Sequence, residues 1–406
     1  MRLDRIIKTL VSSASIDALL KEREPAGYSI DSRTLRAGEL FFAIRGEVHD
    51  GHRFVASAID KGAIAAVVSR DFAASNAESA SRLIVVDDTL VALKRLASVV
   101  LEGWQGRVIA ITGSMGKTTT KEMTAAALAR SGRVLKTTGN LNNEYGLPLS
   151  ILKMETDGAH SSDFDYAVLE MGMNHTGELR ELTRIAPPDL GAVTNVAPVH
   201  LEFFSSVDEI AQAKAELIEG VKPGGAAVLN ADDPRVARMR NIRDDIECRL
   251  IGIEQAADVF ASDIESDGLG GTRFSLVTRR GQTEVSLRLA GRHNVYNALV
   301  AAAVADFYNA PLEEIAASLG ESASPRMRGE VLRFEQGYTV IDDSYNSNPR
   351  ALVEMVTTVS ENRGFERKIV VAGEMLELGR EGARFHQEVG ERIASLGIDL
   401  LIGVRG

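Results

Sequence analysis

The sequence predicts an α/β fold organised in three domains, and three observations support this prediction. The chain has 406 residues, whereas a single hydrophobic core stops growing near about 250–300 residues. Short apolar runs alternate with helical stretches along most of the chain, which is typical of buried parallel strands connected by helices. One apolar run leads through a glycine-containing turn, at residues 113–119, directly into a helical stretch. That succession predicts a phosphate-binding loop in the central domain.

The first predicted domain covers residues 1–104. Its first twenty residues carry charged side chains among the apolar ones, so they predict an amphipathic helix and not a signal peptide. Farther along, apolar runs alternate with helical stretches and glycine-containing turns, which predicts a small α/β domain. These runs lie at residues 40–44, 63–68 and 83–87. A helix ending near Trp104 completes the domain.

The second predicted domain covers residues 105–326 and contains a parallel sheet. Its strands are expected at continuous apolar runs, because strands buried on both faces lack polar alternation. Residues 246–290 switch to period-two alternation, which predicts an antiparallel appendage, and residues 293–319 return to a helical pattern. The four apolar runs lie at residues 107–112, 166–171, 190–196 and 226–230.

The third predicted domain covers residues 327–406 and is again of the α/β type. Apolar runs at residues 338–343, 368–373 and 399–404 predict its strands. The last of these runs ends two residues before the end of the sequence. We therefore expect this C-terminal domain to be truncated and its sheet to be incomplete.

Composition and charge narrow the classes of partner and compartment. The formal net charge of -11 argues against nonspecific binding of nucleic acid or of an anionic membrane, so local basic groups must bind any anionic substrate. The single cysteine, Cys248, allows neither an internal disulfide nor a cysteine metal cluster, which favours a reducing compartment. No stretch approaches the ~18 consecutive apolar residues of a membrane span. We expect a cytoplasmic protein, and a monomer because no exposed apolar stripe is evident.

The predicted phosphate loop lies in the segment RVIAITGSMGKTTTKEM. Gly113 and Gly116 let backbone N–H groups face a common centre at the positive end of a helix. Lys117 can neutralise charge between the β- and γ-phosphates, and the Thr118 hydroxyl can ligate Mg²⁺. The two glycines are three residues apart instead of the usual five, so the loop is a shortened variant. The alternative is a glycine-rich turn with an exposed lysine, but the preceding strand and three successive threonines favour the phosphate loop.

Three more residues are candidates for chemistry at this loop. Glu170 ends an apolar strand at the edge where α/β sheets place ligand groups, so we expect it to bind Mg²⁺ with Thr118; a solvated carboxylate is the alternative. His200 follows the next strand as a lone histidine, which is more often structural than a metal ligand. Lys214 lies on a predicted helix, and the residues alone do not distinguish it from the surface cation Lys222.

A series of motifs begins with the phosphate loop and continues along the chain. The main motifs are TGSMGKTTTKEM at 112–123, TTGNLNNEYGLP at 137–148, LEMGMNHTGEL at 169–179, NVAPVHLEFF at 195–204, GRHNVYNALVAAA at 291–303, DDSYNSNP at 342–349 and GEMLELG at 373–379. In this order they resemble the motifs of the Mur ligase family, and in particular of its members that add D-alanyl-D-alanine to UDP-N-acetylmuramoyl-tripeptide. The resemblance extends over nearly the whole chain.

This resemblance implies a central P-loop parallel-sheet ATPase domain between a small α/β N-terminal domain, which binds the UDP precursor, and a Rossmann-like C-terminal domain. It implies an ADP-forming ligase that activates a carboxylate as an acyl phosphate in peptidoglycan precursor synthesis, and hence a role in cell wall biogenesis, cell shape and cell division. The acceptor's third residue, lysine or diaminopimelate, has no identified motif. The alternative is another amino-acid-adding ligase of the superfamily, either a single-residue Mur ligase or a folylpolyglutamate-type enzyme.

The resemblance also implies roles for individual residues. Lys117, Glu170, His200 and Lys214 are the expected catalytic residues, and Thr118, Glu170, His200 and a carbamylated Lys214 are expected to bind two Mg²⁺ ions. The expected ATP contacts are Gly113, Ser114, Met115, Gly116, Lys117, Thr118, Thr119, His293, Asn294, Asn297, Arg328, Asp343, Asn346 and Asn348. The expected contacts with the UDP-linked substrate are Ser32, Arg33, His49, Asp50, Gly51, His52, Asn140, Asn142 and Asn143. One departure is Glu374, where the family usually has aspartate.

Other classes of protein fit the sequence less well. A regulatory GTPase needs an Asn-Lys-x-Asp motif, which is absent from the sequence. A small-molecule kinase has no need of a separate amine-binding domain. The domain of about 100 residues before the phosphate loop argues against the folate-type ligase. A non-catalytic scaffold is expected to lose Lys117, Glu170 or Lys214, and all three are present.

Overall fold

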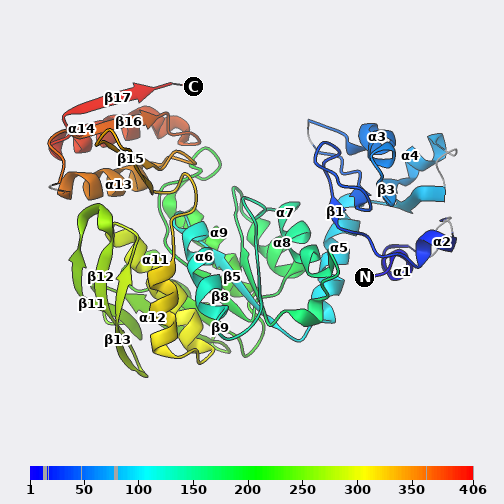
Figure 1. Ribbon diagram of the computed structural model, residues 1–406, viewed down its shortest axis with the longest axis horizontal. Coiled ribbons are helices and arrows are strands. Elements are labelled where there is room, and N and C mark those ends of the chain that lie inside the picture. The colour runs from blue at the N-terminus through cyan, green and yellow to red at the C-terminus, as the bar shows by residue number, and fades with distance from the viewer. Residues whose placement is uncertain (12–15, 17, 47, 77–80, 363, 406) are drawn as a thin grey trace. The chain divides into compact units, whose positions relative to one another are not determined.

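The computed structural model describes residues 1–11, 16, 18–46, 48–76, 81–362 and 364–405, and Figure 1 shows the elements along the chain. The chain divides into two compact units. The first unit comprises Met1–Val108, Arg133–Leu169 and Glu181–Pro187; the second comprises Ile109–Gly132, Glu170–Arg180 and Pro188–Gly406. Of the helix predicted over the first twenty residues, α1 (Leu3–Leu10) and α2 (Ala18–Lys21) are present, and residues 12–15 and 17 lie outside the described residues.

A four-stranded parallel sheet lies in the first unit, in the order β1-β2-β3-β4. The three predicted strands are confirmed as β2 (Leu40–Phe42), β3 (Ala65–Ser69) and β4 (Leu83–Val86). The two-residue β1 (Tyr28–Ser29) is too short to give a periodic signal. The helical elements of this part are η1 (Gly51–Phe54), α3 (Val55–Asp60), α4 (Arg70–Ser75) and α5 (Thr89–Glu102).

A nine-stranded sheet is the largest element of the chain, in the order β13-β12-β11-β10-β9-β8-β5-β7-β6. The four predicted buried strands are confirmed as β5 (Arg107–Thr112), β7 (Tyr166–Glu170), β8 (Leu190–Val193) and β9 (Ala226–Asn230). Both β5 and β9 pair in parallel with β8. Every residue of β8 and β9 is buried, which explains their unbroken apolar sequence. The short β6 (Val134–Lys136) was not predicted.

The predicted antiparallel appendage is wrong for its first two strands. β10 (Glu247–Gly252) pairs in parallel with β9, and β11 (Val259–Ser266) pairs in parallel with β10. A short connection is sufficient because β11 pairs with β10 only at its first two residues and then continues beyond the end of β10. Antiparallel pairing begins between β11 and β12 (Thr272–Thr278) and continues to β13 (Gly281–Leu287), where the alternating burial pattern is also found.

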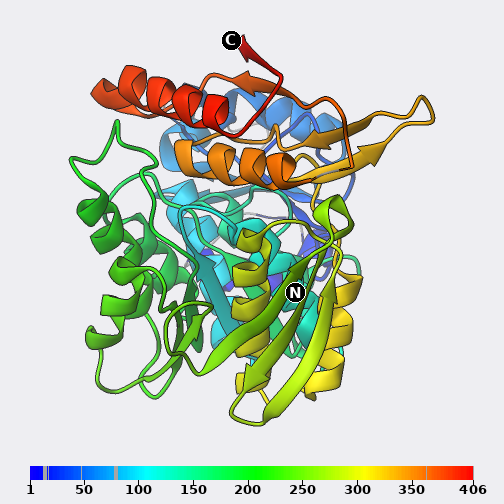
Figure 2. The same ribbon diagram turned by 90° about the vertical axis from the view of Figure 1, so that its left-hand side faces the viewer.

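The helical pattern predicted over residues 293–319 forms two helices, α11 (Arg292–Phe307) and α12 (Leu312–Glu321). Pro311 separates them because proline cannot donate the backbone hydrogen bond of a continuing helix. α11 is buried over most of its length and packs on α6 (Lys117–Leu128), the helix that follows the phosphate loop. Figure 2 shows α11 and α12 in yellow beside the yellow-green strands β11–β13.

The helix α9 (Val207–Glu219) is joined to the segment after β7 by a buried carboxylate. Glu216 on α9 accepts hydrogen bonds from the N–H groups of Gly177, at 2.8 and 3.0 Å, and of Arg180, at 3.1 Å. These groups lie at the start of α8 (Glu178–Ile185), where the first N–H groups of a helix have no acceptor within the helix. Glu216 therefore links the helix that carries Lys214 to the segment that follows Glu170.

Replacing Glu216 by alanine is expected to lower the free energy of unfolding by about 2–4 kcal/mol, because it removes a buried charged acceptor and leaves the part-buried N–H groups of Gly177 and Arg180 without a partner. Urea unfolding would measure this loss. Glu219→Ala is the matched control: the Glu219 carboxylate bonds the guanidinium of the same Arg180 at 3.0 Å but is half exposed, so its loss should cost less than about 1 kcal/mol. Equal losses in the two variants would contradict a special role for Glu216.

The predicted third segment contains two small sheets. β14 (Glu330–Arg333) and β15 (Thr339–Asp342) form an antiparallel pair, and β16 (Ile369–Gly373) and β17 (Leu400–Val404) form a parallel pair. The helices α13 (Pro349–Glu361) and α14 (Gly382–Ser395) pack with the second pair around a cluster that includes Val356, Val370, Met375, Val389 and Ile393. The three predicted strands are confirmed, whereas β14 was not predicted.

Candidate nucleotide-binding and catalytic site

The predicted phosphate loop has the geometry of an anion site. It leaves β5 at Thr112 and enters α6 at Lys117 through Gly116, which caps the helix in the left-handed conformation with φ of 77°. The first turn closes with a 2.8 Å hydrogen bond from the N–H of Thr120 to the carbonyl of Gly116. Within the described part of the chain, the N–H groups of residues 116–119 have no acceptor. They can therefore bind a phosphate at the positive end of α6.

The backbone N–H groups of Ser114 and Met115 donate to another part of the protein, and the predicted ATP contacts of these two residues remain predictions. The N–H of Ser114 donates to the carbonyl of Asn195 at 3.0 Å, and the N–H of Met115 donates to Asn195 Oδ1 at 3.0 Å. Both donors are therefore used inside the protein. The shortened loop offers phosphate a smaller set of backbone groups than the sequence motif suggests.

The ammonium group of Lys117 folds back over the loop. Its Nζ donates to the carbonyl of Gly113 at 2.8 Å and lies 3.5 Å from the carbonyl of Ser114. Burial lowers the pKa of Lys117; the nearby carboxylate of Glu170 raises this pKa, and the guanidinium of Arg328 lowers it. The side chain therefore lies within electrostatic reach of a predicted metal ligand and of a predicted nucleotide contact.

Asn297 and Asn294 form hydrogen bonds that connect the start of α11 to the helix after the phosphate loop. Asn297 Oδ1 accepts from the hydroxyl of Thr120 at 3.1 Å, and Asn297 Nδ2 donates to Asn294 Oδ1 at 3.1 Å. Asn294 Nδ2 donates to the carbonyl of Ala290 at 2.8 Å. A Cβ atom on Gly116 would lie 2.3 Å from Asn297 Oδ1, so only glycine fits there. Each amide atom of Asn297 thus has a partner inside the protein, and its predicted contact with ATP remains a prediction.

His293 lies beside these asparagines at the start of α11. Its Nε2 is 3.1 Å from Asn294 Nδ2, and burial lowers the pKa of His293. A neutral imidazole that accepts from Asn294 helps to hold the helix start in place. Its predicted contact with the nucleotide remains a prediction.

The four predicted catalytic residues are placed near one another. Glu170 ends β7 and is 2% exposed, and Lys214 on α9 is also 2% exposed. Burial lowers the pKa of Lys214 well below its ordinary value, and the charge of Lys117 lowers it further. Burial also lowers the pKa of His200, Glu377 raises it, and the charges of Lys214 and Lys117 lower it.

Lys214 differs from Lys222, from which the residues alone did not distinguish it. Lys222 is half exposed and forms an ion pair with Asp189 at 2.9 Å. Among the residues that the structure describes, none forms a hydrogen bond or ion pair with the Lys214 amine. The interpretation of Lys214 as a solvated surface cation is therefore wrong, because Lys214 lies on the buried face of α9 with Ile210 and Leu217.

His200 is bonded to Glu377, a residue that the sequence analysis did not single out. Glu377 accepts a hydrogen bond at His200 Nδ1, and its backbone carbonyl accepts from the N–H of Glu202 at 3.0 Å. Both His200, with φ of 56°, and Glu377, with φ of 59°, hold left-handed backbone conformations that are uncommon for residues other than glycine. The bond at Nδ1 leaves Nε2 as the ring nitrogen of His200 that can meet a metal or substrate.

A divalent cation fits this site only with help from the nucleotide. Within the described residues, no group of three or more histidine, cysteine, aspartate or glutamate side chains could hold a metal ion. Magnesium, however, commonly keeps several waters and takes one or two carboxylates together with phosphate oxygens. The hydroxyl of Thr118, in the first turn of α6, and the buried carboxylate of Glu170 are suitable donors of this kind.

The predicted nucleotide contacts that follow residue 327 lie in a short polar segment. The guanidinium of Arg328 lies 4.0 Å from the ring centroid of Tyr345, and its charge lowers the pKa of Asp343. Burial outweighs that effect and raises the pKa of Asp343 to about 6. Asn348 Oδ1 accepts from the N–H of Ala351 at 2.9 Å and so caps α13, which begins at Pro349. Asn346 Oδ1 accepts from the N–H of Ser347.

Replacing Asp343 by asparagine is expected to stabilise the protein at pH 7.5 by on the order of 1–2 kcal/mol, after allowance for partial exposure. The folded-state pKa is raised, so the ionised carboxylate costs stability above about pH 6, and this cost disappears as the pH falls toward 4. Thermal unfolding of both proteins at pH 7.5 and 4.5 would measure the difference. A stabilisation of equal size at the two pH values would contradict the raised pKa.

The predicted substrate residues of the first unit are already bonded to their own surroundings. Arg33 pairs with Asp31 at 2.7 Å, and the carbonyl of Ser32 accepts from Lys61 at 2.7 Å. His52 is buried: its Nδ1 lies 2.6 Å from Asp50 Oδ1, and its Nε2 accepts from the N–H of Ser69. Both ring nitrogens are therefore occupied, and His52 anchors the loop instead of facing solvent.

Other members of this predicted substrate set differ in exposure. His49 is exposed, and Gly51 is required by close packing, because an added Cβ would lie 2.7 Å from the carbonyl oxygen of Ile44. Asn140 is exposed and Asn142 is half-buried. Asn143 Oδ1 accepts from the N–H groups of Tyr145 and Gly146 and holds the start of α7 (Gly146–Leu152). The substrate roles of these residues remain predictions.

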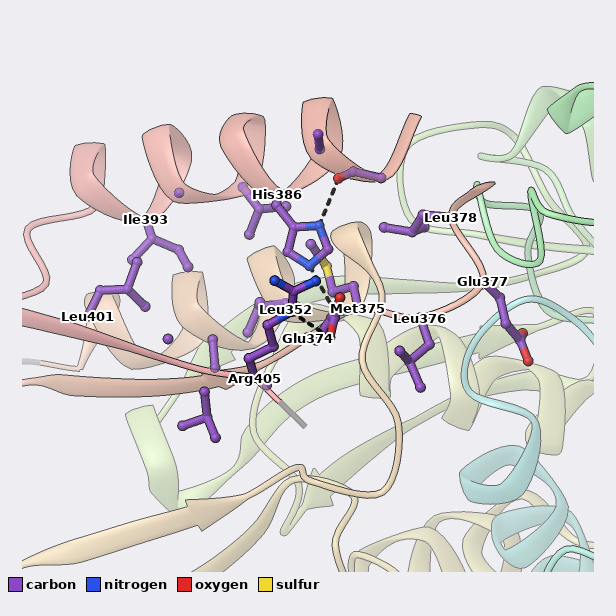
Figure 3. Close-up of a pocket in the computed structure, with 18 of the residues that line it drawn as sticks. Leu352, Glu374, Met375, Leu376, Glu377, Leu378, His386, Ile393, Leu401 and Arg405 are labelled. Carbon is purple, nitrogen blue, oxygen red and sulfur yellow. Dashed lines mark hydrogen bonds and ion pairs between the residues drawn. The ribbon is translucent and has the colours of Figure 1, made fainter. Parts of the chain in front are cut away.

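A cavity of about 1020 Å³ opens beside the ends of β16 and β17. Figure 3 shows His386, Met375, Glu374 and Arg405 around it. His386 Nε2 accepts from the N–H of Met375 at 3.0 Å, and His386 Nδ1 donates to the carbonyl of Gly382 at 2.7 Å, so this histidine has no nitrogen left for acid–base chemistry. Glu374, the departure noted in the sequence, lies 3.8 Å from Arg405. Much of the lining belongs to the hydrophobic cluster of this segment.

A phosphate loop at the end of a parallel strand, with buried lysine and glutamate side chains beside it, defines a nucleoside-triphosphate-binding α/β protein. The chain belongs to the Mur ligase family. Three family models match it: the Mur ligase middle domain over residues 111–305, the Mur ligase, glutamate ligase domain over residues 327–405, and the Mur ligase family, catalytic domain over residues 25–100. The resemblance inferred from the sequence motifs and the predicted fold class are thereby confirmed.

Curated relatives point to one branch of the family. The chain is 36% identical to the UDP-N-acetylmuramoyl-tripeptide--D-alanyl-D-alanine ligase of Escherichia coli K12, covering 92% of this chain and 80% of the relative. It is 35% identical to the ligase of the same name from Bacillus subtilis 168, covering 92% and 78%. The matches cover most of both proteins, so the similarity is not confined to the nucleotide-binding part.

Solved structures agree with this grouping. The chain superposes on MurF from Acinetobacter baumannii with a TM-score of 0.82 and 33% identity, covering 93% of this chain and 80% of that one. It superposes on MurF ligase from Thermotoga maritima in complex with ADP with a TM-score of 0.78 and 28% identity, covering 94% and 88%. A folate ligase complex shares only the fold, with a TM-score of 0.61 and 18% identity. None of the described helices is long and apolar enough to cross a membrane.

Proposed function

We propose that this protein joins D-alanyl-D-alanine to UDP-N-acetylmuramoyl-tripeptide in an ATP-dependent, ADP-forming reaction of peptidoglycan precursor synthesis. The observation that carries the proposal is the grouping of Lys117, Glu170 and Lys214 at a phosphate loop, in a chain whose relatives of that name match over most of their length. The alternative of a folate-type ligase is not favoured, because its likeness is limited to the fold. One acceptor substrate carries a UDP group, the phosphoryl donor is ATP, and the third substrate is a free dipeptide; we propose that the protein acts on them in the cytoplasm.

The chemistry has two steps. A carboxylate oxygen of the tripeptide attacks the γ-phosphorus of ATP, which forms an acyl phosphate and releases ADP. The amine of the dipeptide then attacks the acyl carbon, the amide bond forms, inorganic phosphate leaves and the amine loses a proton. Both steps concentrate negative charge, so catalysis depends mainly on positioning and electrostatic stabilisation. The Lys117 ammonium and the N–H groups of residues 116–119 supply that stabilisation at the phosphates.

Two finer proposals concern the metals and Lys214. Bound Mg²⁺ would offset phosphate charge, with the Thr118 hydroxyl and the Glu170 carboxylate as protein donors and His200 Nε2 near a second ion. We propose that Lys214 reacts with CO₂ to form a carbamate. Two features support this reaction: the amine is buried without an acceptor among the described residues, and burial favours its neutral, nucleophilic form.

We further propose a division of labour along the chain. Residues 1–104 would bind the UDP-linked precursor, residues 105–326 the nucleotide, and residues 327–406 would contribute Arg328 and Asp343 to the nucleotide and assist the dipeptide. Monomeric action is our working proposal. The family matches to residues 25–100, 111–305 and 327–405 support these boundaries.

The decisive assay is phosphate release from ATP with Mg²⁺ and UDP-N-acetylmuramoyl-tripeptide, with and without D-alanyl-D-alanine. We expect sustained release only when both substrates are present, together with formation of the pentapeptide product. Acceptors that end in lysine or in diaminopimelate should be tested in parallel. Release that depends on a single amino acid, and not on the dipeptide, would reject this substrate pair.

A further inference from the structure

The carboxamide of Asn195, a residue that follows β8, forms hydrogen bonds with the backbone of the phosphate loop. The N–H of Met115 donates to Asn195 Oδ1 at 3.0 Å, and Asn195 Nδ2 donates to the carbonyl of Met115 at 3.1 Å. The hydroxyl of Thr194 donates to the same carbonyl at 2.7 Å. One carboxamide therefore satisfies both polar groups of Met115, much as a neighbouring strand would.

Ser114 extends the same attachment by one residue. Its N–H donates to the backbone carbonyl of Asn195 at 3.0 Å, and its hydroxyl donates to the carbonyl of Ala197 at 3.2 Å. The N–H of Ala197 in turn donates to the Ser114 hydroxyl oxygen at 2.9 Å. Residues 194–197 thus form a support for the loop, because they bond to the backbone of Ser114 and Met115 and to the hydroxyl of Ser114.

The short loop makes this support necessary. With three residues between the first glycine and the Lys117 helix start, the loop has few peptide groups that could bond to one another. It also lies so close to the support that a Cβ atom on Gly113 would be 1.9 Å from the hydroxyl oxygen of Thr194. The conformation of the loop is therefore set from outside, by side chains of a neighbouring strand end.

We propose that Asn195 is a positioning residue of the phosphate loop, which holds the Met115 peptide so that, among residues 114–119, only the N–H groups of residues 116–119 remain to bind the phosphates of a nucleotide. This inference rests on the proposed nucleotide-binding function. Asn195 does not contact phosphate itself, but it determines which backbone N–H groups of the loop can bind phosphate. It also predicts that Ser114 and Met115 keep their internal hydrogen bonds when a nucleotide is bound.

The first test compares Asn195→Ala with Asn230→Ala. Asn230, at the end of the adjacent β9, is a matched control: its carboxamide also makes two backbone hydrogen bonds, to the carbonyl of Thr194 and the N–H of Asp232, and none to the loop. Calorimetric titration with ADP should show affinity about tenfold weaker in Asn195→Ala, the equivalent of one lost hydrogen bond, and within about twofold of the native value in Asn230→Ala.

Residue-resolved amide hydrogen exchange without nucleotide supplies a readout that general destabilisation would not give. The Met115 amide should exchange about tenfold faster in Asn195→Ala but stay protected in Asn195→Asp, where Oδ1 still accepts its proton. Equal acceleration in Asn195→Ala and Asn230→Ala, or unchanged ADP affinity in Asn195→Ala, would overturn the proposal.

A second measurement uses only the native protein and so does not depend on a variant that folds. Saturating ADP should slow amide exchange at residues 116–119 and leave Ser114 and Met115 unchanged, because their N–H groups already have acceptors. New protection at Ser114 or Met115 would refute the restriction to residues 116–119. Native protein that binds no ADP would overturn both this inference and the proposed function, whereas normal binding with an unaffected Asn195→Ala overturns this inference alone.

Discussion

Replacement of Lys117 by alanine is expected to lower kcat/KM for ATP-dependent ligation by about 10³-fold or more, because the variant loses the cation that meets the transferring phosphoryl group. In the free protein the ammonium is held by the carbonyl of Gly113 at 2.8 Å, so it is already placed over the loop. Burial lowers its pKa, and the Glu170 carboxylate beside it favours the charged form. The assay is ATP- and dipeptide-dependent phosphate release.

The matched control for this prediction is Lys222→Ala. Lys222 is also a lysine of the second unit, but it pairs with Asp189 at the surface. Its removal should change kcat/KM by less than about threefold, because exposed ion pairs contribute little. The Lys117→Ala variant should unfold at a similar urea concentration to the native protein, since it removes a buried charge. Ligation by Lys117→Ala within tenfold of the native rate would reject the assignment of the phosphate loop.

The parts of the fold that the sequence predicted are those in which one periodicity dominates. Strands β8 and β9 are buried throughout, which explains why their sequences are short, unbroken apolar runs. The parallel direction of β10 and β11 relative to their neighbours was not predicted. The alternation of polar and apolar residues, which belongs to β12 and β13, was taken to cover the whole segment 246–290. Direction depends on where a strand starts relative to its neighbour, and β11 starts beside the end of β10.

The candidate site shows a similar limit. The motif correctly located the turn from β5 into α6, because glycine, lysine and threonine there follow a buried strand. It did not predict which N–H groups are free, since that depends on Asn195, some 80 residues later in the sequence. The internal partners of Asn297 could not be predicted for the same reason: an amide offers a donor and an acceptor to any partner, and here the partners are Thr120 and Asn294.

The burial of Lys214 could not be predicted from the sequence, although it decides what chemistry the side chain favours. In the sequence it is one of two lysines close together, and only the packing of α9 distinguishes a 2% exposed amine from a half-exposed one. A buried amine without an acceptor among the described residues is costly as a cation. The same cost favours its conversion into a carbamate. This group would be an anion, so it would attract bound metal ions and would not repel the ammonium group of Lys117.

Replacement of Lys214 by arginine is accordingly expected to lower kcat/KM for ligation by about 10³-fold or more, as in Lys117→Ala. The affinity for ADP should stay within about threefold of the native value. A guanidinium keeps its charge and cannot form the carbamate, and it adds a fixed cation near Lys117. Carbon-13 NMR with labelled bicarbonate should give a carbamate resonance in the native protein and in Lys222→Arg, but none in Lys214→Arg. A resonance that persists in Lys214→Arg, or a native activity that does not change when bicarbonate is removed, would show that Lys214 acts as an unmodified amine. In that case the negative charge needed beside the metals would have to come from Glu170 and the nucleotide alone.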